Sequence, residues 1–207
     1  MESVRSEKDS SSSMAELLYC ATGSSAVIGL PEILRLVLLR GFVARVNLVL
    51  TFSTQQFVDD DTLAFDERIS LVRELSDLQR LQLRSHTELA RSAAAAVVAP
   101  ATANVIGKIA NGIVDDPVTT ILNVYGRPIL LFPAIHPITF RKKSFQRNLD
   151  TLVSDGHVVL GPVKGNSLSD NTRYDEYGAM PGPERVVAMI ERAMRLGVQD
   201  LSSVKLE

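Results

Sequence analysis

The amino-acid sequence predicts an α/β fold in which helices cover both faces of a parallel sheet. Short runs of almost continuous apolar residues alternate along the chain with stretches whose apolar residues recur at helical spacing. Strands that are apolar along their whole length are typical of parallel sheets, which are buried on both faces. Small or polar residues follow several of these runs, at the strand ends where ligands of such sheets bind.

The first part of the chain is predicted to form a strand, a turn, a helix and a second strand. The apolar run 16–21 predicts the first strand, and the small residues 22–25 predict a tight turn after it. Apolar side chains over 28–38 then have helical spacing, and Gly41 marks the end of this helix. The run 42–50, rich in Val and Leu, predicts the next strand. Together these segments form a βαβ unit, whose crossover we expect to be right-handed.

The rest of the chain continues this alternation. We expect a charged surface helix or lid over 68–83. Buried strands are expected over 93–99, 128–132 and 157–160, and further helices over 106–110, 144–153 and 183–196. Residues 163–182 instead carry Gly, Asn, Asp, Ser and Pro without periodicity. This segment is long for a structureless loop, and loops of this length usually serve a function.

The composition is that of a globular protein. The chain has 207 residues, of which 45% are hydrophobic and 22% are charged, so one domain with an apolar core is expected and general disorder is excluded. The 22 Lys and Arg residues against 24 Asp and Glu give a net charge of −2, which argues against a nucleic-acid-binding protein. The single cysteine, Cys20, excludes an intramolecular disulfide and a Cys-rich zinc site, and no metal site is predicted. Cys20 lies in an apolar run and is expected to be buried.

The composition also divides the chain into three parts. Residues 1–14 are expected to be a disordered arm, 15–200 a single domain, and 201–207 a tail. The arm has no apolar run of the signal-peptide type, and no apolar run in the chain is long enough to span a bilayer. These features predict a cytoplasmic protein that binds neither membrane nor nucleic acid.

Clusters of small or polar residues stand at three predicted strand ends, at 22–25, 100–104 and 133–137. Because ligands of parallel α/β sheets bind at the carboxyl ends of the strands, we expect these clusters to converge on one crevice. Backbone N–H groups and hydroxyls at 22–25 suit a phosphate at a helix N-terminus, although an ordinary tight turn has the same pattern. The hydroxyls of 51–54 add to this site, and the absence of a GxGxxG or Walker sequence favours a monophosphate.

The cluster PATAN at 100–104 combines small residues, which admit a flat ring, with the hydrogen-bond donor and acceptor of Asn104. Asn104 is equally suited to cap the helix that follows. Among the histidines, His136 follows a strand end in a proline-flanked loop and has the better position for function. His86 has polar neighbours ahead of the strand at 93–99, and His157 is expected to be structural.

Several motifs together resemble those of the homo-oligomeric flavin-containing cysteine decarboxylases. They are LLYCATGSSAV at 17–27, SHTEL at 85–89, PATAN at 100–104, KIANGIVDD at 108–116, Thr119 with Thr120, and QRNL at 146–149. The resemblance extends from about residue 15 to 196, and the block from PATAN to KIANGIVDD is highly specific. It implies a flavodoxin-like three-layer α/β sandwich, in agreement with the fold class that the apolar pattern predicts.

The resemblance also implies that the domain is a flavoprotein that binds FMN, or FAD as in some family members. The residues that it assigns to the flavin are Gly23, Ser24, Ser25, Thr51, Ser53, Thr102, Ala103, Asn104, Val105 and Ala134. His86 matches the active-site histidine and is expected to act as the general base that promotes oxidation of the substrate thiol. The resemblance further implies a homo-oligomer, a trimer or a dodecamer built of trimers, with the flavin at a subunit boundary.

Two enzymatic branches share these motifs. One decarboxylates 4′-phosphopantothenoylcysteine in coenzyme A biosynthesis and carries a cysteine in a late substrate clamp. The other oxidatively decarboxylates a C-terminal cysteine of a ribosomal precursor peptide to an enethiol, as in the epidermin- and mersacidin-type lanthipeptide pathways to aminovinyl-cysteine. Residues 161–182 contain no cysteine, and 166–181 (NSLSDNTRYDEYGAMP) resembles the peptide-branch clamp. The sequence therefore favours the peptide branch, with a Cys-ended precursor peptide as the partner.

One position departs from the family pattern. Both branches usually have Pro-X-Met-Asn after the fourth strand, whose Asn binds the substrate carboxylate, whereas this chain has PAIH at 133–136. His136 is expected to take over that hydrogen bond, with Met180 and Asn104 as further substrate contacts. The alternatives are phosphopantothenoylcysteine decarboxylation, a non-enzymatic regulatory flavoprotein of the same fold, and flavin prenylation, which different loop residues carry out.

Overall fold

The computed structural model of the chain describes residues 15–80, 85–166 and 173–201. Its strands are β1 (Glu16–Ala21), β2 (Arg45–Leu50), β3 (Ile69–Val72), β4 (Ala93–Ala101), β5 (Ile129–Pro133), β6 (Val158–Val159), β7 (Val163–Asn166) and β8 (Arg173–Ala179). The α-helices are α1 (Leu30–Leu39), α2 (Asp60–Leu63), α3 (Leu75–Arg80), α4 (His86–Ser92), α5 (Ala103–Ala110), α6 (Pro117–Asn123), α7 (Pro137–Phe140), α8 (Lys143–Ser154) and α9 (Pro183–Leu196). Short 3₁₀ helices are η1 (Ser25–Gly29), η2 (Phe52–Gln56) and η3 (Val198–Leu201). The expected arm at 1–14 and the tail after residue 201 lie outside the described residues.

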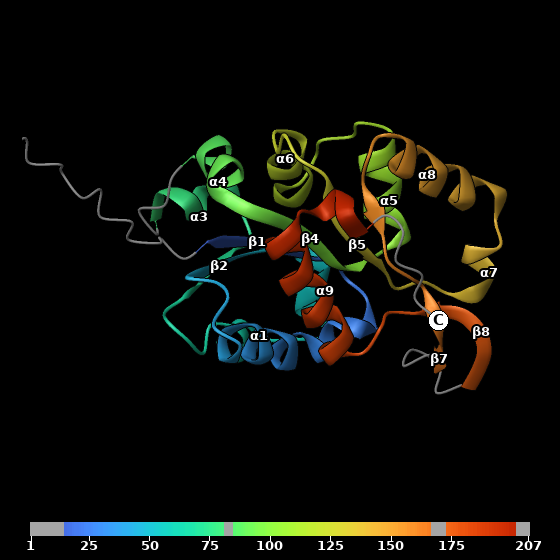
Figure 1. Ribbon diagram of the computed structural model, residues 1–207, viewed down its shortest axis with the longest axis horizontal. Helices are drawn as coiled ribbons and strands as arrows, with labels where there is room; N and C mark the ends of the chain where they lie inside the picture. The colour runs from blue at the N-terminus through green and yellow to red at the C-terminus, as the bar shows by residue number, and fades with distance from the viewer. Residues whose placement is uncertain (1–14, 81–84, 167–172, 202–207) are drawn as a thin grey trace, which may run out of the picture.

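Six strands form one parallel sheet in the order β3-β2-β1-β4-β5-β6, and β7 and β8 form a separate antiparallel pair. This order is that of a doubly wound sheet, in which the strand order reverses between β1 and β4. Helices α1 and α9 cover one face of the sheet, and α4, α5, α6 and α8 cover the other (Figure 1). The predicted flavodoxin-like three-layer α/β sandwich is confirmed.

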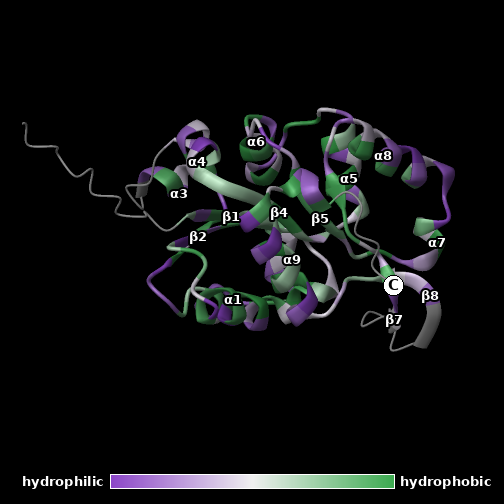
Figure 2. Cartoon of the chain, viewed as in Figure 1, coloured by the Kyte–Doolittle hydropathy of each residue, from purple (hydrophilic) through white to green (hydrophobic). Residues whose placement is uncertain are grey.

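The side chains of β1 show why the sequence folds into three layers. Successive side chains of a strand point to opposite faces of the sheet. Leu17 and Tyr19 therefore pack with α1 and α9, whereas Leu18 and Cys20 pack with the helices of the other face, and all four are fully buried. Figure 2 shows the hydrophobic central strands between helices that carry both hydrophobic and hydrophilic residues, as amphipathic covering helices do.

The expectation of a single helix over 68–83 is wrong. Residues 69–72 form β3, which pairs in parallel with β2 at the edge of the sheet, and α3 begins only at Leu75. Ile69 and Val72 are β-branched and buried, and both properties favour a strand. Pairing with β2 therefore outweighs the weaker helical pattern of this charged segment. Residues 81–84 of the expected helix lie outside the described residues.

The expectation of a structureless loop over 163–182 is wrong as well. Within it, 163–166 and 173–179 form the antiparallel pair β7–β8, with Val163 opposite Ala179. The hairpin stands apart from the central sheet and next to α7 (Figure 1). No helix among the residues that the structure describes has the length and apolar character needed to cross a membrane.

Candidate functional site

A cavity of about 610 Å³ opens at the carboxyl ends of β1, β4 and β5, beside the point where the strand order reverses. The turn after β1 lines it with Gly23–Ser25, the end of β4 with Thr102, and the segment after β5 with 134–137. The three strand ends that the sequence predicts to converge therefore meet at one cavity. This is the place where doubly wound sheets bind their ligands.

Gly23 lies directly against the segment that follows β2. A Cβ atom at this position would lie 2.2 Å from Ser53 Oγ and 3.0 Å from the Ser53 carbonyl carbon, so a side chain would have to displace this backbone. The neighbouring Ser24 has a local role, because its Oγ accepts the Ala26 N–H at 3.3 Å and caps η1. Glycine at position 23 thus lets two strand ends approach each other at the cavity.

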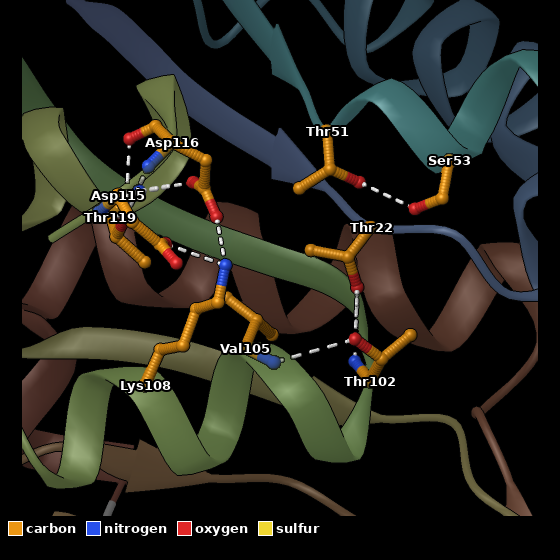
Figure 3. A network of polar contacts seen from close by, with 9 residues as sticks. All are labelled: Thr22, Thr51, Ser53, Thr102, Val105, Lys108, Asp115, Asp116 and Thr119. Carbon is orange, nitrogen blue, oxygen red and sulfur yellow. Dashed lines mark hydrogen bonds and ion pairs between the residues drawn. The ribbon is translucent and has the colours of Figure 1, made fainter. Parts of the chain in front are cut away.

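Thr22 and Thr102 join the ends of β1 and β4 (Figure 3). The Thr22 hydroxyl donates to the Pro100 carbonyl oxygen at 2.8 Å and accepts the Thr102 N–H at 3.0 Å. The Thr102 hydroxyl oxygen lies 3.0 Å from that of Thr22 and accepts the Val105 N–H, so that it caps α5. Thr102 is therefore the N-cap of α5, and the alternative of a capping role for Asn104 is wrong.

The residues assigned to the flavin fall into two groups. Those that line the cavity are Gly23, Ser24, Ser25, Thr102 and Ala134. Those that lie outside its lining are Thr51, Ser53, Ala103, Asn104 and Val105. Within the second group, the Thr51 and Ser53 hydroxyls are 3.2 Å apart beside Gly23 (Figure 3). The hydroxyl-rich end of β2 thus supports the turn after β1 from behind.

His136 lines the cavity at the start of α7. Its Nδ1 accepts the Ile138 N–H at 3.2 Å and caps this helix. A ring nitrogen that accepts a hydrogen bond carries no proton, so the neutral imidazole has its proton on Nε2. Asn, which the family pattern places here, is also a preferred N-cap residue. The substitution therefore keeps the cap, and the other ring nitrogen carries the N–H.

His86 lies elsewhere in the chain's own fold. It is the first residue of α4, after the N-cap Ser85, and it is partly exposed. Ser85 and Glu88 fix this helix end, because the Ser85 N–H donates to Glu88 Oε2 at 2.9 Å and the Glu88 N–H donates to Ser85 Oγ at 3.3 Å. His86 is not one of the residues that line the cavity. A single chain thus does not bring its expected base to the expected substrate site.

The β7–β8 hairpin contributes residues whose role is not evident from the sequence. Glu176, Gly178 and Ala179 line the cavity together with Met180, which was assigned to the substrate from the sequence. The Ile135 N–H donates to the Gly178 carbonyl oxygen at 2.9 Å, and a Cβ at Gly178 would lie 2.6 Å from the Ile135 carbonyl oxygen. The glycine in an otherwise polar and aromatic strand is the sequence signal of this close approach.

Lys108 braces the segment between α5 and α6 (Figure 3). Its Nζ lies 2.6 Å from Asp115 Oδ1 and 2.8 Å from Asp116 Oδ2, and hydrogen bonds to these carboxylates raise the pKa of Lys108. Asp116 caps α6 by accepting the Thr119 N–H at 2.9 Å. Burial acts to raise the pKa of Asp116, but the hydrogen bonds from Lys108 and Thr119 outweigh it and lower this pKa. In the single chain the KIANGIVDD motif is a structural brace outside the cavity lining.

Two residues expected to be structural have that role. Cys20 is fully buried, and burial raises the pKa of its thiol. His157 Nδ1 accepts the Ile129 N–H at 3.2 Å, and burial lowers the pKa of this imidazole. No group of three or more His, Cys, Asp or Glu side chains among the described residues is arranged to hold a metal ion.

Comparison with known proteins identifies the family of this chain. The sequence model of the family described as Flavoprotein matches residues 5–195, which include all three layers of the sandwich. The chain belongs to the Flavoprotein family. The family's name agrees with a cavity at the strand ends that has a polar turn in its lining.

This flavoprotein has curated relatives in two enzyme groups. It is 31% identical over 176 residues to the coenzyme A biosynthesis bifunctional protein CoaBC of Bacillus subtilis, with 85% of this chain and 42% of that protein covered. It is 26% identical over 184 residues to mersacidin decarboxylase of a Bacillus species, with 87% of this chain and 91% of that protein covered. The chain thus spans less than half the length of the CoaBC relative and nearly all of the mersacidin enzyme.

A solved structure gives a third comparison for this flavoprotein. TvaF, described as an FMN-dependent cysteine decarboxylase from thioviridamide biosynthesis, is 34% identical to this chain with a TM-score of 0.64. The match covers 72% of this chain and 90% of that one. The likeness therefore extends over most of the fold.

The residues of the cavity fit a flavin. Its volume of about 610 Å³ falls in the range of roughly 300–1,000 Å³ that is usual for small-molecule sites. The turn 23–25 and the start of η1 offer a polar end for a phosphate, and the glycine leaves room for it to approach the backbone. Ile28 and Phe57 form an apolar side and are 58% and 38% exposed, so a flat ring system would bury them. In the sequence Ile28 is only part of the helical spacing over 28–38, so this apolar wall becomes evident only in the fold.

Proposed function

We propose that this chain is an FMN-dependent enzyme that oxidatively decarboxylates a C-terminal cysteine of a ribosomal precursor peptide to an enethiol, as in aminovinyl-cysteine formation. The family and its relatives support a flavin-dependent cysteine decarboxylase, with FMN as the cofactor. The observation that favours a peptide substrate is the lack of a cysteine in 161–182, a segment that includes the hairpin residues of the cavity lining. The coenzyme A branch has a cysteine in this segment and uses it to reduce its intermediate.

The reaction needs an electron sink, because loss of CO₂ from cysteine itself leaves an unstabilised carbanion. FMN, when bound, supplies a two-electron acceptor for oxidation of the substrate thiol to a thioaldehyde. The thioaldehyde accepts the electron pair of the breaking carbon–carbon bond as CO₂ leaves. The peptide thereby loses CO₂ and two hydrogens, and the enethiol is released because 161–182 offer no thiol to return a proton and permit re-reduction. Repeated turnover requires an external acceptor such as O₂.

The chain's own residues have three roles in this reaction: they hold the cofactor, they position the substrate, and they remove the thiol proton. The turn 23–25 and Thr102 hold the cofactor at the strand ends. The Nε2–H of His136 donates to the substrate carboxylate, and because this contact weakens as CO₂ leaves, its main role is positioning. His86 takes the thiol proton as general base, supplied by a neighbouring copy in a homo-oligomer because it lies outside the cavity of its own chain.

The second candidate is phosphopantothenoylcysteine decarboxylation, which the identity of 31% to CoaBC favours. The two enzymes use the same oxidation and loss of CO₂, and they differ in whether the product is reduced again. A regulatory flavoprotein without turnover is the third reading of the same fold. Substrate and product analysis separates the three.

The deciding experiment incubates the FMN-loaded protein with a Cys-ended peptide and follows the product by mass spectrometry. Oxidative decarboxylation removes roughly 46 Da, whereas redox-neutral decarboxylation removes roughly 44 Da. We expect the larger loss, and no reaction of the same peptide with an amidated C-terminus. Turnover of phosphopantothenoylcysteine without peptide turnover would assign the chain to the coenzyme A branch. FMN binding without either reaction would favour the regulatory role.

A further inference from the structure

Glu176 places a negative charge at the cavity, and Arg141 lies against it. Among the described residues that line the cavity, Glu176 is the only one with a carboxylate, and none is Lys or Arg. The guanidinium of Arg141 forms an ion pair with this carboxylate. Arg141 is the C-cap of α7, the short helix that begins after His136. The pair therefore links the helix that His136 caps to strand β8 of the hairpin.

The ion pair lies beside an aromatic contact between α7 and β8, and both of its side chains are exposed. The neighbouring residues Phe140 and Tyr177 place their rings 6.1 Å apart, so α7 and β8 are in contact beside the ion pair. The side chains of Arg141 and Glu176 are 59% and 48% exposed. An ion pair this exposed adds little to folding stability. The ion pair can nevertheless change the net charge at the cavity, because it neutralises the carboxylate of Glu176.

The ligands of the proposed reaction are anionic. The substrate brings a C-terminal carboxylate, and the cofactor brings a phosphate. An unpaired Glu176 would repel a second carboxylate in the same cavity, and none of the described lining residues carries a permanent positive charge that would offset this repulsion. With Arg141 in contact, the two side chains together are neutral.

We propose that Arg141 is a specificity-determining residue, which neutralises Glu176 and thereby lets the cavity accept a substrate with a free carboxylate. The inference rests on the proposed function, which supplies the carboxylate. It assigns to Arg141 an electrostatic role, distinct from the mechanical role of fastening β8 to α7. The two roles give different results when both charges are removed.

The test measures binding of a probe that does not react. The FMN-loaded protein is titrated with two peptides that end in serine in place of cysteine, one with a free carboxylate and one with an amide. We expect the wild type to prefer the carboxylate. Arg141→Met should reduce this preference roughly fivefold by weakening the carboxylate peptide alone, because Glu176 is then unpaired.

A double variant separates charge from fastening. Arg141→Met combined with Glu176→Gln removes both charges and also the ion pair, and the carboxylate preference should return to within about twofold of the wild type. Lys142→Met is the matched control, because it removes a cation next to Arg141 in sequence and leaves the ion pair intact. Its carboxylate preference should equal that of the wild type.

Three results would overturn the inference. They are equal weakening of both peptides by Arg141→Met, persistence of the loss in the double variant, and absence of a carboxylate preference in the wild type. Turnover of a Cys-ended peptide, measured in parallel, tests the proposed function by itself. Turnover accompanied by any of these three results refutes this inference alone, whereas an Arg141-dependent preference without turnover refutes only the proposed reaction.

Discussion

His136 shows at the scale of a single residue how one side chain serves both the fold and the cavity. Its Nδ1 caps α7 and its Nε2 carries the proton, so a replacement must offer both an acceptor and a donor. Asn offers both and Ala neither. We expect His136→Asn to keep most of the activity, and His136→Ala to raise KM about tenfold and to lower the free energy of unfolding by roughly 1 kcal/mol. Steady-state kinetics and urea unfolding measure these effects, and an unchanged KM in the Ala variant would refute the carboxylate contact.

The buried hydroxyl group of Tyr19 is expected to lower the stability of the fold. It is fully buried on β1, and its hydroxyl makes no hydrogen bond within the part of the chain that the structure describes. A buried hydroxyl without a partner has lost its bonds to water and gained none. Tyr19→Phe keeps the ring and should raise the free energy of unfolding by about 1 kcal/mol, seen as a higher denaturant midpoint at an unchanged m value. A lower midpoint would show that the hydroxyl has a partner in the folded protein.

At the scale of elements, burial on both faces decides which strands the sequence reveals. The strands β1, β2, β4 and β5 lie inside the sheet and are nearly continuous in apolar residues, so they are predicted correctly. At the edge, β3 carries the polar Ser70 among charged neighbours, so its few apolar residues fit helical spacing equally well. The hairpin β7–β8 lies outside the central sheet, and its Gly and polar residues have the composition of a loop.

The candidate site divides in the same way. Gly23 and Thr102 are predictable because the strand, the turn and the helix start that position them are consecutive in the sequence. Glu176 and Phe57 reach the cavity from the hairpin and from the end of η2, segments that are far from those turns along the chain. Their meeting depends on the packing of the whole sheet, which local pattern does not encode.

Arg73, which directly follows the edge strand β3, also positions an element of the cavity. This side chain is only 10% exposed, and it donates from Nε to Asp60 Oδ1 at 2.7 Å and from Nη1 to Thr54 Oγ1 at 2.8 Å. Thr54 lies on η2, and Phe57 at the end of η2 lines the cavity. Arg73→Met should release η2 and weaken FMN binding about tenfold in a fluorescence-quenching titration, since it removes the charged hydrogen bonds that join this guanidinium to Asp60 and Thr54.

Arg68→Met is the control for this prediction. Arg68 precedes β3, is partly exposed, and pairs with Asp66 at 2.6 Å. Its replacement removes the same charge without touching Thr54, and it should leave the Kd of FMN unchanged. An equal loss of FMN affinity in both variants would mean that net charge, rather than the position of η2, controls binding.

At the scale of the whole molecule, one chain leaves its cavity incomplete in two respects. Ile28 and Phe57 remain 58% and 38% exposed along its apolar side, and His86 lies outside its lining. A neighbouring copy in a closed homo-oligomer can cover the apolar side and bring its own His86 to the cavity. We infer that a homo-oligomer would explain both observations, in agreement with the oligomer that the sequence resemblance implies.

Mixed oligomers test whether His86 acts on the cavity of another chain. His86→Ala should keep FMN and lose turnover by a factor of about 10²–10⁴, the usual contribution of a general base. Gly23→Ala should lose FMN, because the added Cβ would lie 2.2 Å from Ser53 Oγ. Each variant alone is then inactive.

In co-expressed oligomers, the intact cavity of a His86→Ala chain can receive the intact His86 of a neighbouring Gly23→Ala chain. Random mixing gives this combination at roughly a quarter of the sites, so roughly a quarter of the wild-type activity should return. Activity that never exceeds that of the separate variants, in oligomers shown by mass to contain both chains, would place the base in the same chain as the cavity.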